Sequence, residues 1–277
     1  MEFQFVSRRP AALERFVESV WYARGRIDYT SERIAPTGST VAVVVLGDPI
    51  REWPADGAGD PLTTSTGFLI GPHDRPVVNE PLGETHCVGV VTTPVGCGPL
   101  FGLSPPALRG RVVELLDVWP AAAGLRRSLL ARNASPDELL DLVTATLAAQ
   151  EPRATAAVDR CERAVAALEA DPARGIGALA AELGISHGHL DKEFLDVVGL
   201  SPRALARILR LRVLLARLDV YGAVDWAELA ADLGWFDQSH LIRDFRRHTG
   251  VTPSEYVAAQ RGSFAPDQAA PGFVPKR

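Results

Sequence analysis

The sequence predicts an α+β protein in which a β-rich N-terminal domain precedes an all-α C-terminal domain. The first hundred residues contain short β-branched and apolar segments separated by clusters of Gly and Pro, a pattern typical of antiparallel strands. From about residue 104 the pattern becomes helical, and the last hundred residues contain an internal repeat of helical segments. A chain of 277 residues is long enough for two domains, each with its own core.

The composition is that of a globular protein and excludes several other classes. Apolar residues make up 47% of the chain and charged residues 23%, and the net charge is −5. No apolar run reaches the roughly 18 residues of a membrane span, and the N-terminus lacks a secretion signal pattern. The three cysteines have no CxxC spacing, so we expect no disulfide framework and a reducing, cytoplasmic environment.

Three segments of the N-terminal domain have the clearest strand character. Their apolar and β-branched side chains are bounded by turn-forming residues, at residues 39–47, 66–71 and 85–93. A short helix is expected from Pro10 to Phe16, with Pro in its first turn. We therefore expect residues 1–150 to form a small, barrel-like β domain with flanking helices.

A capping box marks the best-defined helix start in the middle of the chain. Ser135, Pro136 and Glu138 combine an N-cap serine, a first-position proline and a glutamate three residues after the cap. A helix should run from there to about Gln150. A further helix is expected at about residues 153–170.

Two other segments have simpler signals. Ser104 followed by Pro105 is typical of an N-cap and a first helical position. The Pro-, Gly- and Ala-rich residues 263–277 predict a disordered tail.

The internal repeat is the strongest organisational feature of the sequence. LAAELGISHGHLDKEFLDVVGLSP (179–202) and LAADLGWFDQSHLIRDFRRHTGVTP (229–253) share Leu-Ala-Ala, a Gly five residues after that Leu, Leu-x3-Phe, another Gly and a final Pro. Each copy is interpreted as helix, Gly-containing turn and helix, which is the layout of a helix-turn-helix. A plain αα-hairpin is the alternative interpretation for a single copy.

The second copy has an asymmetric distribution of charge. At about 100° per residue its second helix buries Leu241, Ile242 and Phe245 on one face. The opposite face carries basic and polar side chains suited to phosphate and guanine contacts, namely Ser239, His240, Arg243, Arg246 and Arg247. A solvated basic face without function is the alternative.

The first copy is less basic. Leu190 and Phe194 face inward on its second helix, while His189, Lys192 and Asp196 face outward. Because phosphate repels acidic side chains, this helix should be the weaker DNA binder. Its histidines, His187 among them, are equally well interpreted as capping or surface groups.

These residues resemble the DNA-binding domain of the AraC/XylS family of bacterial transcription regulators. GWFDQSHLIRDFRRHTGVTPSEY is similar to that family's most specific signature, and GISHGHLDKEF followed by GLSPRALARILRLR resembles its first motif and linking helix. The resemblance implies an all-α domain, here residues 153–262, with two helix-turn-helix motifs joined by a long helix at about Pro202 to Leu218. It also implies recognition helices in successive major grooves, about 34 Å apart.

The N-terminal part is more loosely similar to the sensor half of one AraC-type branch. The likeness lies in APTGSTVAVVV, GFLIGPHDRPV and the aromatic pair Trp21-Tyr22. It implies effector sensing or dimerisation by this domain. The expected partners are double-stranded operator DNA, an unknown small-molecule effector, RNA polymerase and a second copy of the chain, with no membrane.

The sequence lacks the common motifs of enzyme chemistry. It contains no GxSxG, HExxH, Walker-type or GxGxxG pattern, so we expect no enzyme activity, catalytic residue or cofactor. Cys97, between two glycines, is a better candidate for a reactive thiol than Cys87, which lies in a predicted strand. His73 and His86 could join a cysteine at a metal, but their spacing does not support a metal site.

The sequence therefore favours a cytoplasmic bacterial transcription factor that binds DNA sequence-specifically and activates or represses transcription. The alternatives are a DNA-repair methyl acceptor with an AraC-like domain, whose cysteine motifs are missing, and a degenerate helix-turn-helix used for protein contacts. The expected DNA-binding residues are His187, His189 and Lys192 in the first motif and Gln238, Ser239, His240, Arg243, Arg246 and Arg247 in the second.

Overall fold

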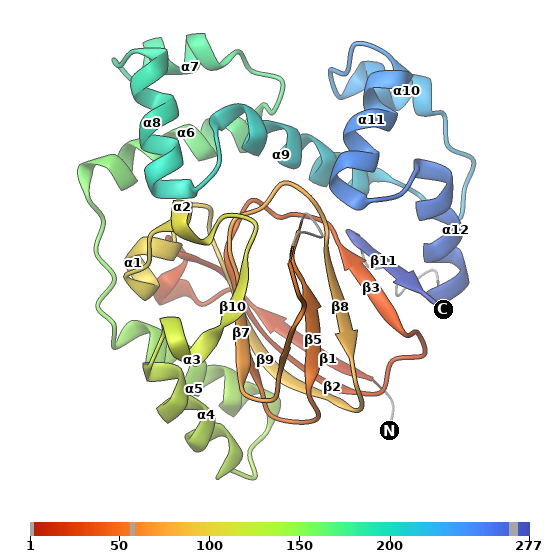
Figure 1. The fold of residues 1–277 in the computed structure, drawn as a ribbon. Helices are drawn as coiled ribbons and strands as arrows, with labels where there is room; N and C mark the ends of the chain where they lie inside the picture. Colours follow the sequence, from red (N-terminus) through yellow and green to blue (C-terminus); the bar gives the residue numbers. More distant parts are fainter. Residues whose placement is uncertain (1–2, 56–58, 266–270) are drawn as a thin grey trace.

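The computed structural model describes residues 3–55, 59–265 and 271–277, and in them two antiparallel sheets lie beneath a layer of helices (Figure 1). The first sheet has the strand order β1-β2-β9-β4-β7-β10 and the second has the order β11-β3-β8-β5-β6. The expected barrel-like domain is therefore a pair of facing sheets that do not close into one barrel. The first sheet consists of β1 (Gln4–Arg8), β2 (Val17–Gly25), β4 (Val41–Val45), β7 (Gly67–Ile70), β9 (Thr85–Thr92) and β10 (Val112–Glu114). The second consists of β3 (Ser31–Ile34), β5 (Ile50–Trp53), β6 (Leu62–Thr64), β8 (Val77–Pro81) and β11 (Phe273–Lys276).

The three predicted strands are confirmed as β4, β7 and β9. They are neighbours at the centre of the first sheet, where both faces are covered and β-branched side chains are buried on both sides. The second sheet was not predicted, because its strands are short and carry polar residues. β5, for example, lies within a stretch rich in Gly and Pro that has the composition of a loop.

An apolar core fills the space between the two sheets. Its buried side chains come from both sheets and include Val43, Val45, Ile50, Phe68 and Cys87. This core is separate from the main core, which lies on the other side of the first sheet.

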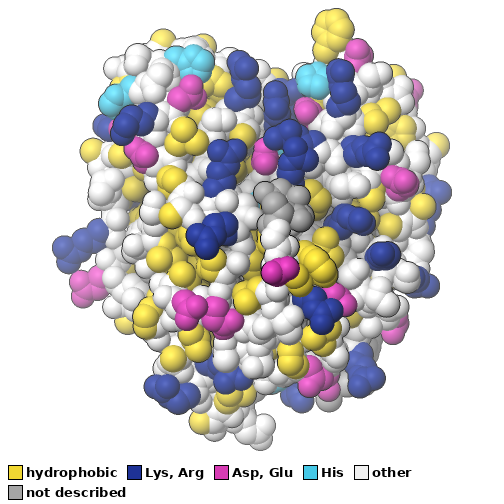
Figure 2. Space-filling view, in the orientation of Figure 1, with side chains coloured by type: hydrophobic (Ala, Val, Ile, Leu, Met, Phe, Trp, Pro, Cys, Tyr) yellow, Lys and Arg dark blue, Asp and Glu magenta, His cyan; other side chains and the backbone are white. Residues whose placement is uncertain are grey.

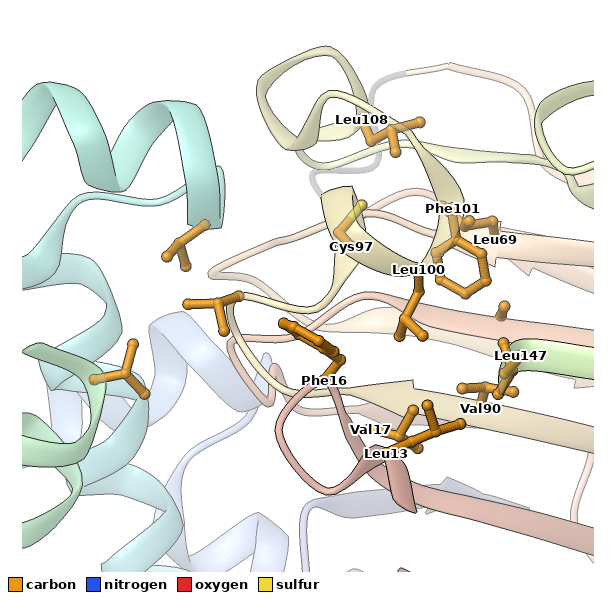
Figure 3. Close-up of a cluster of buried hydrophobic side chains, with 14 of the residues drawn as sticks. Leu13, Phe16, Val17, Leu69, Val90, Cys97, Leu100, Phe101, Leu108 and Leu147 are labelled. Atoms are coloured by element: carbon orange, nitrogen blue, oxygen red, sulfur yellow. The ribbon is translucent and has the colours of Figure 1, made fainter. Parts of the chain in front are cut away.

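Short helices cover that other side of the first sheet. They are the 3-10 helix η1 (Ala11–Leu13), α1 (Cys97–Phe101), α2 (Pro105–Leu108), α3 (Leu115–Val118), α4 (Ala121–Leu130) and α5 (Pro136–Ala148). Helices α3, α4 and α5 pack against β7, β4 and β2. Figure 3 shows part of this core, in which Leu147 of α5 lies beside Val90 of β9.

The remaining helices form a layer across the upper edge of the sheets (Figure 1). They are α6 (Ala156–Ala170), α7 (Ile176–Glu182), α8 (His187–Val198), α9 (Pro202–Arg217), α10 (Trp226–Asp232), α11 (Gln238–Thr249) and α12 (Pro253–Ser263). Helices α7 and α8 lie at one end of α9, and α10 and α11 lie at the other. α9 is the predicted linking helix and ends one residue before the expected boundary.

The best-defined predicted helix start is confirmed at the level of hydrogen bonds. The Ser135–Glu138 capping box opens α5, and Thr252 and Glu255 form a second capping box at the start of α12. Ser104 occupies the N-cap position of α2, but its side chain accepts no capping hydrogen bond and the helix has only four residues. The predicted helix from Pro10 to Phe16 is reduced to the single 3-10 turn η1.

The C-terminal tail differs from the predicted disorder. Phe273–Lys276 form β11, which pairs with β3 in antiparallel register, and Gln260 of α12 donates a hydrogen bond from Nε2 to the Phe273 carbonyl at 2.6 Å. Strand pairing between segments more than two hundred residues apart has no local sequence signal. Residues 266–270 of the predicted tail lie outside the described residues.

Within the described residues, no helix has both the length and the apolar character needed to cross a membrane.

Candidate nucleic-acid interface

In the second motif, α10–turn–α11, side chains of the turn form hydrogen bonds with residues of α11. Asp237 accepts a hydrogen bond on Oδ1 from the His240 amide at 2.6 Å and is therefore the N-cap of α11. Trp235 Nε1 donates to Asp244 Oδ2 at 3.0 Å, and the Arg210 guanidinium lies 5.3 Å from the centre of the Trp235 ring. These contacts fix the orientation of α11 relative to α9.

The buried face of α11 is wider than the helical projection suggests. Leu241 and Phe245 are fully buried as predicted, and Phe245 packs edge-on against Tyr256 of α12 at a centroid distance of 5.5 Å. Asp244 and His248 are also buried on this side. Burial of Asp244 is possible because Trp235 donates to it.

Four of the predicted contact residues lie exposed on the other side of α11. They are Gln238, Ser239, Arg243 and Arg246. Within the described residues, neither Arg243 nor Arg246 forms an ion pair. Their guanidinium groups are therefore free to meet phosphates or base edges.

His240 and Arg247 have partners inside the protein. His240 is half-buried, with Nε2 3.5 Å from Asp244 Oδ2. Arg247 donates from Nη2 to Asp74 Oδ2 at 2.6 Å, and Asp74 belongs to the loop between β7 and β8 of the N-terminal domain. The helical projection placed these two residues beside Arg243, but the structure brings them to neighbouring carboxylates.

Asp74 contacts a second residue at the C-terminal end of α11. Its backbone carbonyl lies 2.8 Å from His248 Nδ1. Burial lowers the pKa of His248. Burial opposes ionisation of Asp74, but the hydrogen bond from Arg247 and the charges of neighbouring basic groups outweigh it and lower its pKa. The contact therefore pairs a carboxylate with a guanidinium at neutral pH.

The first motif, α7–turn–α8, has a similar backbone but paired charges. Ser186 caps α8 by accepting a hydrogen bond from the His189 amide at 3.2 Å. His187, His189 and Lys192 are exposed, and each faces an acidic residue one helical turn later, in the pairs His187–Asp191 at 3.6 Å, His189–Glu193 at 3.1 Å and Lys192–Asp196 at 3.0 Å. The acidic partners in these i,i+4 pairs make the face that would meet DNA less positive.

Glu193 is further held from outside the motif. Arg160 of α6 donates from Nε to Glu193 Oε2 at 2.9 Å. The C-terminal end of α8 also packs closely against the N-terminal domain at Gly199. A Cβ added at Gly199 would lie 3.0 Å from side-chain atoms of both Pro72 and Pro105. The first motif is thus packed into the main core, whereas the second has a core of its own.

The distribution of basic side chains follows this difference. Figure 2 shows Lys and Arg side chains gathered over the upper centre of the molecule, between the two motifs, while histidines over the first motif lie beside acidic groups. The two motifs are joined by the 16-residue α9, which spans roughly 24 Å at the α-helical rise. The two second helices thus differ in charge, since α11 carries three arginines and one aspartate, whereas α8 carries one lysine and three acidic residues.

Sequence reasoning missed one residue of this surface. Phe236 lies in the turn just before α11, and 92% of its surface is exposed, while its neighbour Trp235 is buried. The two consecutive aromatic residues were the available sequence signal for an exposed side chain. A tight turn before a capped helix can direct only one of two such neighbours into the core, so the other must face solvent.

The cysteines considered as reactive thiols and the histidine considered as a metal ligand are buried. Burial raises the pKa of Cys97 to about 11 and that of Cys87 to about 12, so neither is a reactive thiol at neutral pH. His73 is buried with Nδ1 2.9 Å from the Gly71 carbonyl oxygen. Among the described residues, no three His, Cys, Asp or Glu side chains are grouped to hold a metal ion.

The paired motifs define the class of the protein, which is a double helix-turn-helix protein with an N-terminal β domain. Residues 179–259 match the family described as a helix-turn-helix domain, and residues 9–114 match a family described as a domain of unknown function (DUF6597). Comparison with curated proteins found no match.

Several solved structures are similar to the chain. ToxT from Vibrio cholerae is 13% identical over 93% of this chain and 98% of its own, with a TM-score of 0.49. ToxT with a bound unsaturated fatty acid is 15% identical over 91% and 94%, with a TM-score of 0.47. A probable AraC family transcriptional regulator from Rhodopseudomonas palustris is 30% identical over 36% of this chain and 95% of its own, with a TM-score of 0.32.

The match to the helix-turn-helix family covers the part of the chain that carries both motifs. The chain belongs to the AraC family of transcriptional regulators.

Proposed function

We propose that the protein is a sequence-specific DNA-binding regulator in which α11 supplies the main base contacts. The observation that carries this proposal is the exposed face of α11, where Arg243 and Arg246 are unpaired within the described residues and lie beside exposed Ser239 and Gln238. Arginine presents a planar pair of donors to guanine, and each such base contact contributes about 1–3 kcal/mol of discrimination.

The first motif has a supporting role in this proposal. Its exposed basic groups, His187, His189 and Lys192, must exchange an acidic neighbour for a phosphate. Giving up a solvated ion pair on a helix surface costs only about 0.3–0.5 kcal/mol, but the acidic neighbours then remain close to the DNA and repel its phosphates. Helix α8 therefore orients the domain on DNA, and α11 reads the sequence.

We further propose that a small-molecule effector bound by the N-terminal domain controls DNA binding in the bacterial cytoplasm. The support is the contact between Asp74 and α11, which joins the sensor half directly to a proposed DNA contact, Arg247. Arg247 can reach a phosphate only if it leaves Asp74. A change in the loop between β7 and β8 would therefore alter DNA affinity.

A second candidate function is protein contact through the same motif. The observation on its side is the nearly fully exposed Phe236, which is a single apolar side chain and not the contiguous patch that usually marks an interaction surface. RNA polymerase and a second copy of the chain are the expected partners of such a surface.

Selection of binding sites from random duplex DNA, followed by affinity measurement, tests the proposal. Arg243→Ala should weaken binding to the selected site by about 1–3 kcal/mol and relax the preference at one base position. Arg132→Ala removes the same charge from the exposed surface of the N-terminal domain and should leave the preference unchanged. A chain that selects no sequence, or binds all duplexes without salt dependence, would leave only the protein-contact function.

A further inference from the structure

Phe236 has the most exposed large hydrophobic side chain in the part of the chain that the structure describes. It lies in the turn of the second motif, one residue before the N-cap of α11, and 92% of its surface is exposed. The next most exposed side chain of this kind is that of Phe5, at 58%. Because the ring of Phe236 is not buried on folding, the fold does not require an aromatic side chain at this position.

Both sequence neighbours of Phe236 are held by the protein. Trp235 is buried, and its Nε1 donates to Asp244 Oδ2 at 3.0 Å. On the other side, Asp237 accepts a hydrogen bond on Oδ1 from the His240 amide at 2.6 Å. These contacts fix the backbone on either side of Phe236, so the exposed ring is presented at a defined point of the surface.

The ring lies at the end of α11 that is remote from the N-terminal domain. Contacts to Asp74 hold the C-terminal end of α11, and the 12 residues of this helix span about 18 Å at the α-helical rise. Figure 1 shows α11 in the layer above the sheets, with its C-terminal end toward them. In a helix-turn-helix, it is the N-terminal part of the second helix that reaches the base edges in the major groove.

Phe236 adjoins the proposed DNA contacts of α11. Ser239, Arg243 and Arg246 are exposed and recur about once per helical turn, so they lie along one face of the helix. Gln238 is exposed as well, and the residues from Phe236 to Ser239 are therefore exposed without a break. This surface has one apolar group at its N-terminal end and guanidinium groups further along the helix.

The surroundings of Phe236 favour DNA over a protein as the partner of the ring. The other exposed large hydrophobic side chains of the described chain belong to other elements, and the nearest of them in sequence is Tyr221, which precedes α10. A protein interface has a core of several apolar side chains, whereas the major groove offers isolated apolar groups, the C5 methyl groups of thymine. The arginines of α11 suit the same partner, since they are attracted to its phosphates.

We propose that Phe236 contacts the C5 methyl group of a thymine in the major groove, at the end of the site that α11 binds. The ring covers the methyl group and removes it from water. Cytosine lacks this methyl group, so the contact distinguishes the two pyrimidines. The proposal rests on the proposed DNA-binding function and adds to it one base position at which thymine is preferred.

Deoxyuridine is the probe for this contact, because it differs from thymidine only by the missing C5 methyl group and forms the same base pair. The preferred site of the full chain is first selected from random duplex DNA. Each thymine of that site is then replaced in turn by deoxyuridine, and the affinity is measured by fluorescence anisotropy.

One replacement should weaken binding of the wild-type chain by about fourfold, the equivalent of about 0.8 kcal/mol for one buried methyl-sized group. In Phe236→Ala the same replacement should have no effect, because the ring that covers the methyl group is gone. Site selection with Phe236→Ala should return the wild-type sequence except for the loss of the thymine preference at this position. The ring and the methyl group then depend on each other, which a purely structural role of Phe236 would not produce.

Phe5→Ala is the matched control. Phe5 is an exposed phenylalanine on β1 of the N-terminal domain, so its removal should leave both the affinity and the response to deoxyuridine as in the wild type. The melting temperature of Phe236→Ala verifies that this variant is folded, since the loss of an exposed ring should leave it nearly unchanged.

Two outcomes overturn the proposal while the regulator stands. One is a wild-type chain that selects a sequence but binds it equally well with deoxyuridine at every thymine. The other is a Phe236→Ala variant that keeps the wild-type response to each replacement. In either case, weaker self-association of Phe236→Ala would assign the ring to a protein contact instead. A wild-type chain that selects no sequence at all would refute the proposed regulator, and this contact with it.

Discussion

Arg247 of α11 donates a hydrogen bond from Nη2 to Asp74 Oδ2 at 2.6 Å, although the two residues are 173 positions apart in the chain. The neighbouring residue His248 contacts the backbone carbonyl of the same Asp74. A helix expected to face DNA is thus attached at its C-terminal end to the sensor half. The contact makes the state of the N-terminal domain and the availability of Arg247 interdependent.

Removal of Asp74 should release Arg247 for DNA. In Asp74→Ala, the free guanidinium adds a phosphate contact, and we expect the affinity for a selected site to rise roughly fivefold at low salt. Asp117→Ala removes an equal charge from the exposed surface of α3 and should have a much smaller effect. Fluorescence anisotropy in the Arg247→Ala background completes the cycle, where Asp74→Ala should change nothing. Weaker binding by Asp74→Ala alone would contradict the prediction.

The two aromatic residues of the second turn should differ strongly in their effect on stability. Trp235 is 4% exposed and donates to the buried Asp244, so Trp235→Ala should cost about 3–5 kcal/mol of unfolding free energy. Phe236 is 92% exposed, so Phe236→Ala should change stability by no more than about 0.5 kcal/mol. Urea denaturation of the two variants measures both values. Comparable losses would mean that Phe236 packs in solution.

Glycines with left-handed backbone should respond to alanine according to their surroundings. Gly184 (φ 71°) has open space around its Cβ position, so Gly184→Ala should cost only backbone strain, about 1–2 kcal/mol. Gly199 (φ 77°) faces Pro72 and Pro105 at 3.0 Å, so Gly199→Ala must also displace the N-terminal domain. The melting temperature of Gly199→Ala should therefore be the lower of the two. Equal melting temperatures would contradict the prediction, because they would mean that Pro72 and Pro105 can move away from the added methyl group without loss of stability.

The buried carboxyl of Glu52 predicts a pH dependence of stability. Its pKa is raised in the folded chain, so above the ordinary pKa of glutamate the folded state holds a proton that the unfolded state has released. Stability from this group is therefore full below that value and falls as the pH rises, by up to about 1.4 kcal/mol per pH unit.

Glu52→Gln should remove this component. Its advantage in stability over the wild type should grow as the pH rises above the ordinary pKa of glutamate, for as long as the folded wild-type group stays protonated. Denaturant titrations at several pH values measure the difference. A difference that is constant with pH would mean that Glu52 ionises normally in the folded chain.

The features predicted correctly from the sequence are those that depend on local physics. The repeat with its glycines, caps and Leu-x3-Phe spacing predicted α7, α8, α10 and α11, because capping and amphipathic periodicity act within a few residues. The Val-rich segment of β4 was recognisable because a central strand buries both of its faces.

The unpredicted features depend on contacts between distant segments. Helical periodicity places Arg247 on an exposed face, but it cannot show that a loop of the N-terminal domain supplies Asp74 to it. Similarly, the strand character of β11 comes from pairing with β3, and its Pro275 has the composition of a loop. The position of Asn79 between Glu32 and Glu52 arises from the register of three strands that local patterns did not identify.

The position of β11 changes how the two domains are connected. The second sheet contains strands from both ends of the chain, so the DNA-binding helices are, in topological terms, an insertion between β10 and β11 of the sensor domain. An inserted domain has two covalent tethers, and its motion is restricted to rotation about the line that joins them. A DNA-binding fragment cut at residue 262 would lose one tether and also leave the edge of β3 unpaired in the remaining sensor. Affinities measured on isolated halves would therefore describe a molecule with freedoms that the intact chain does not have.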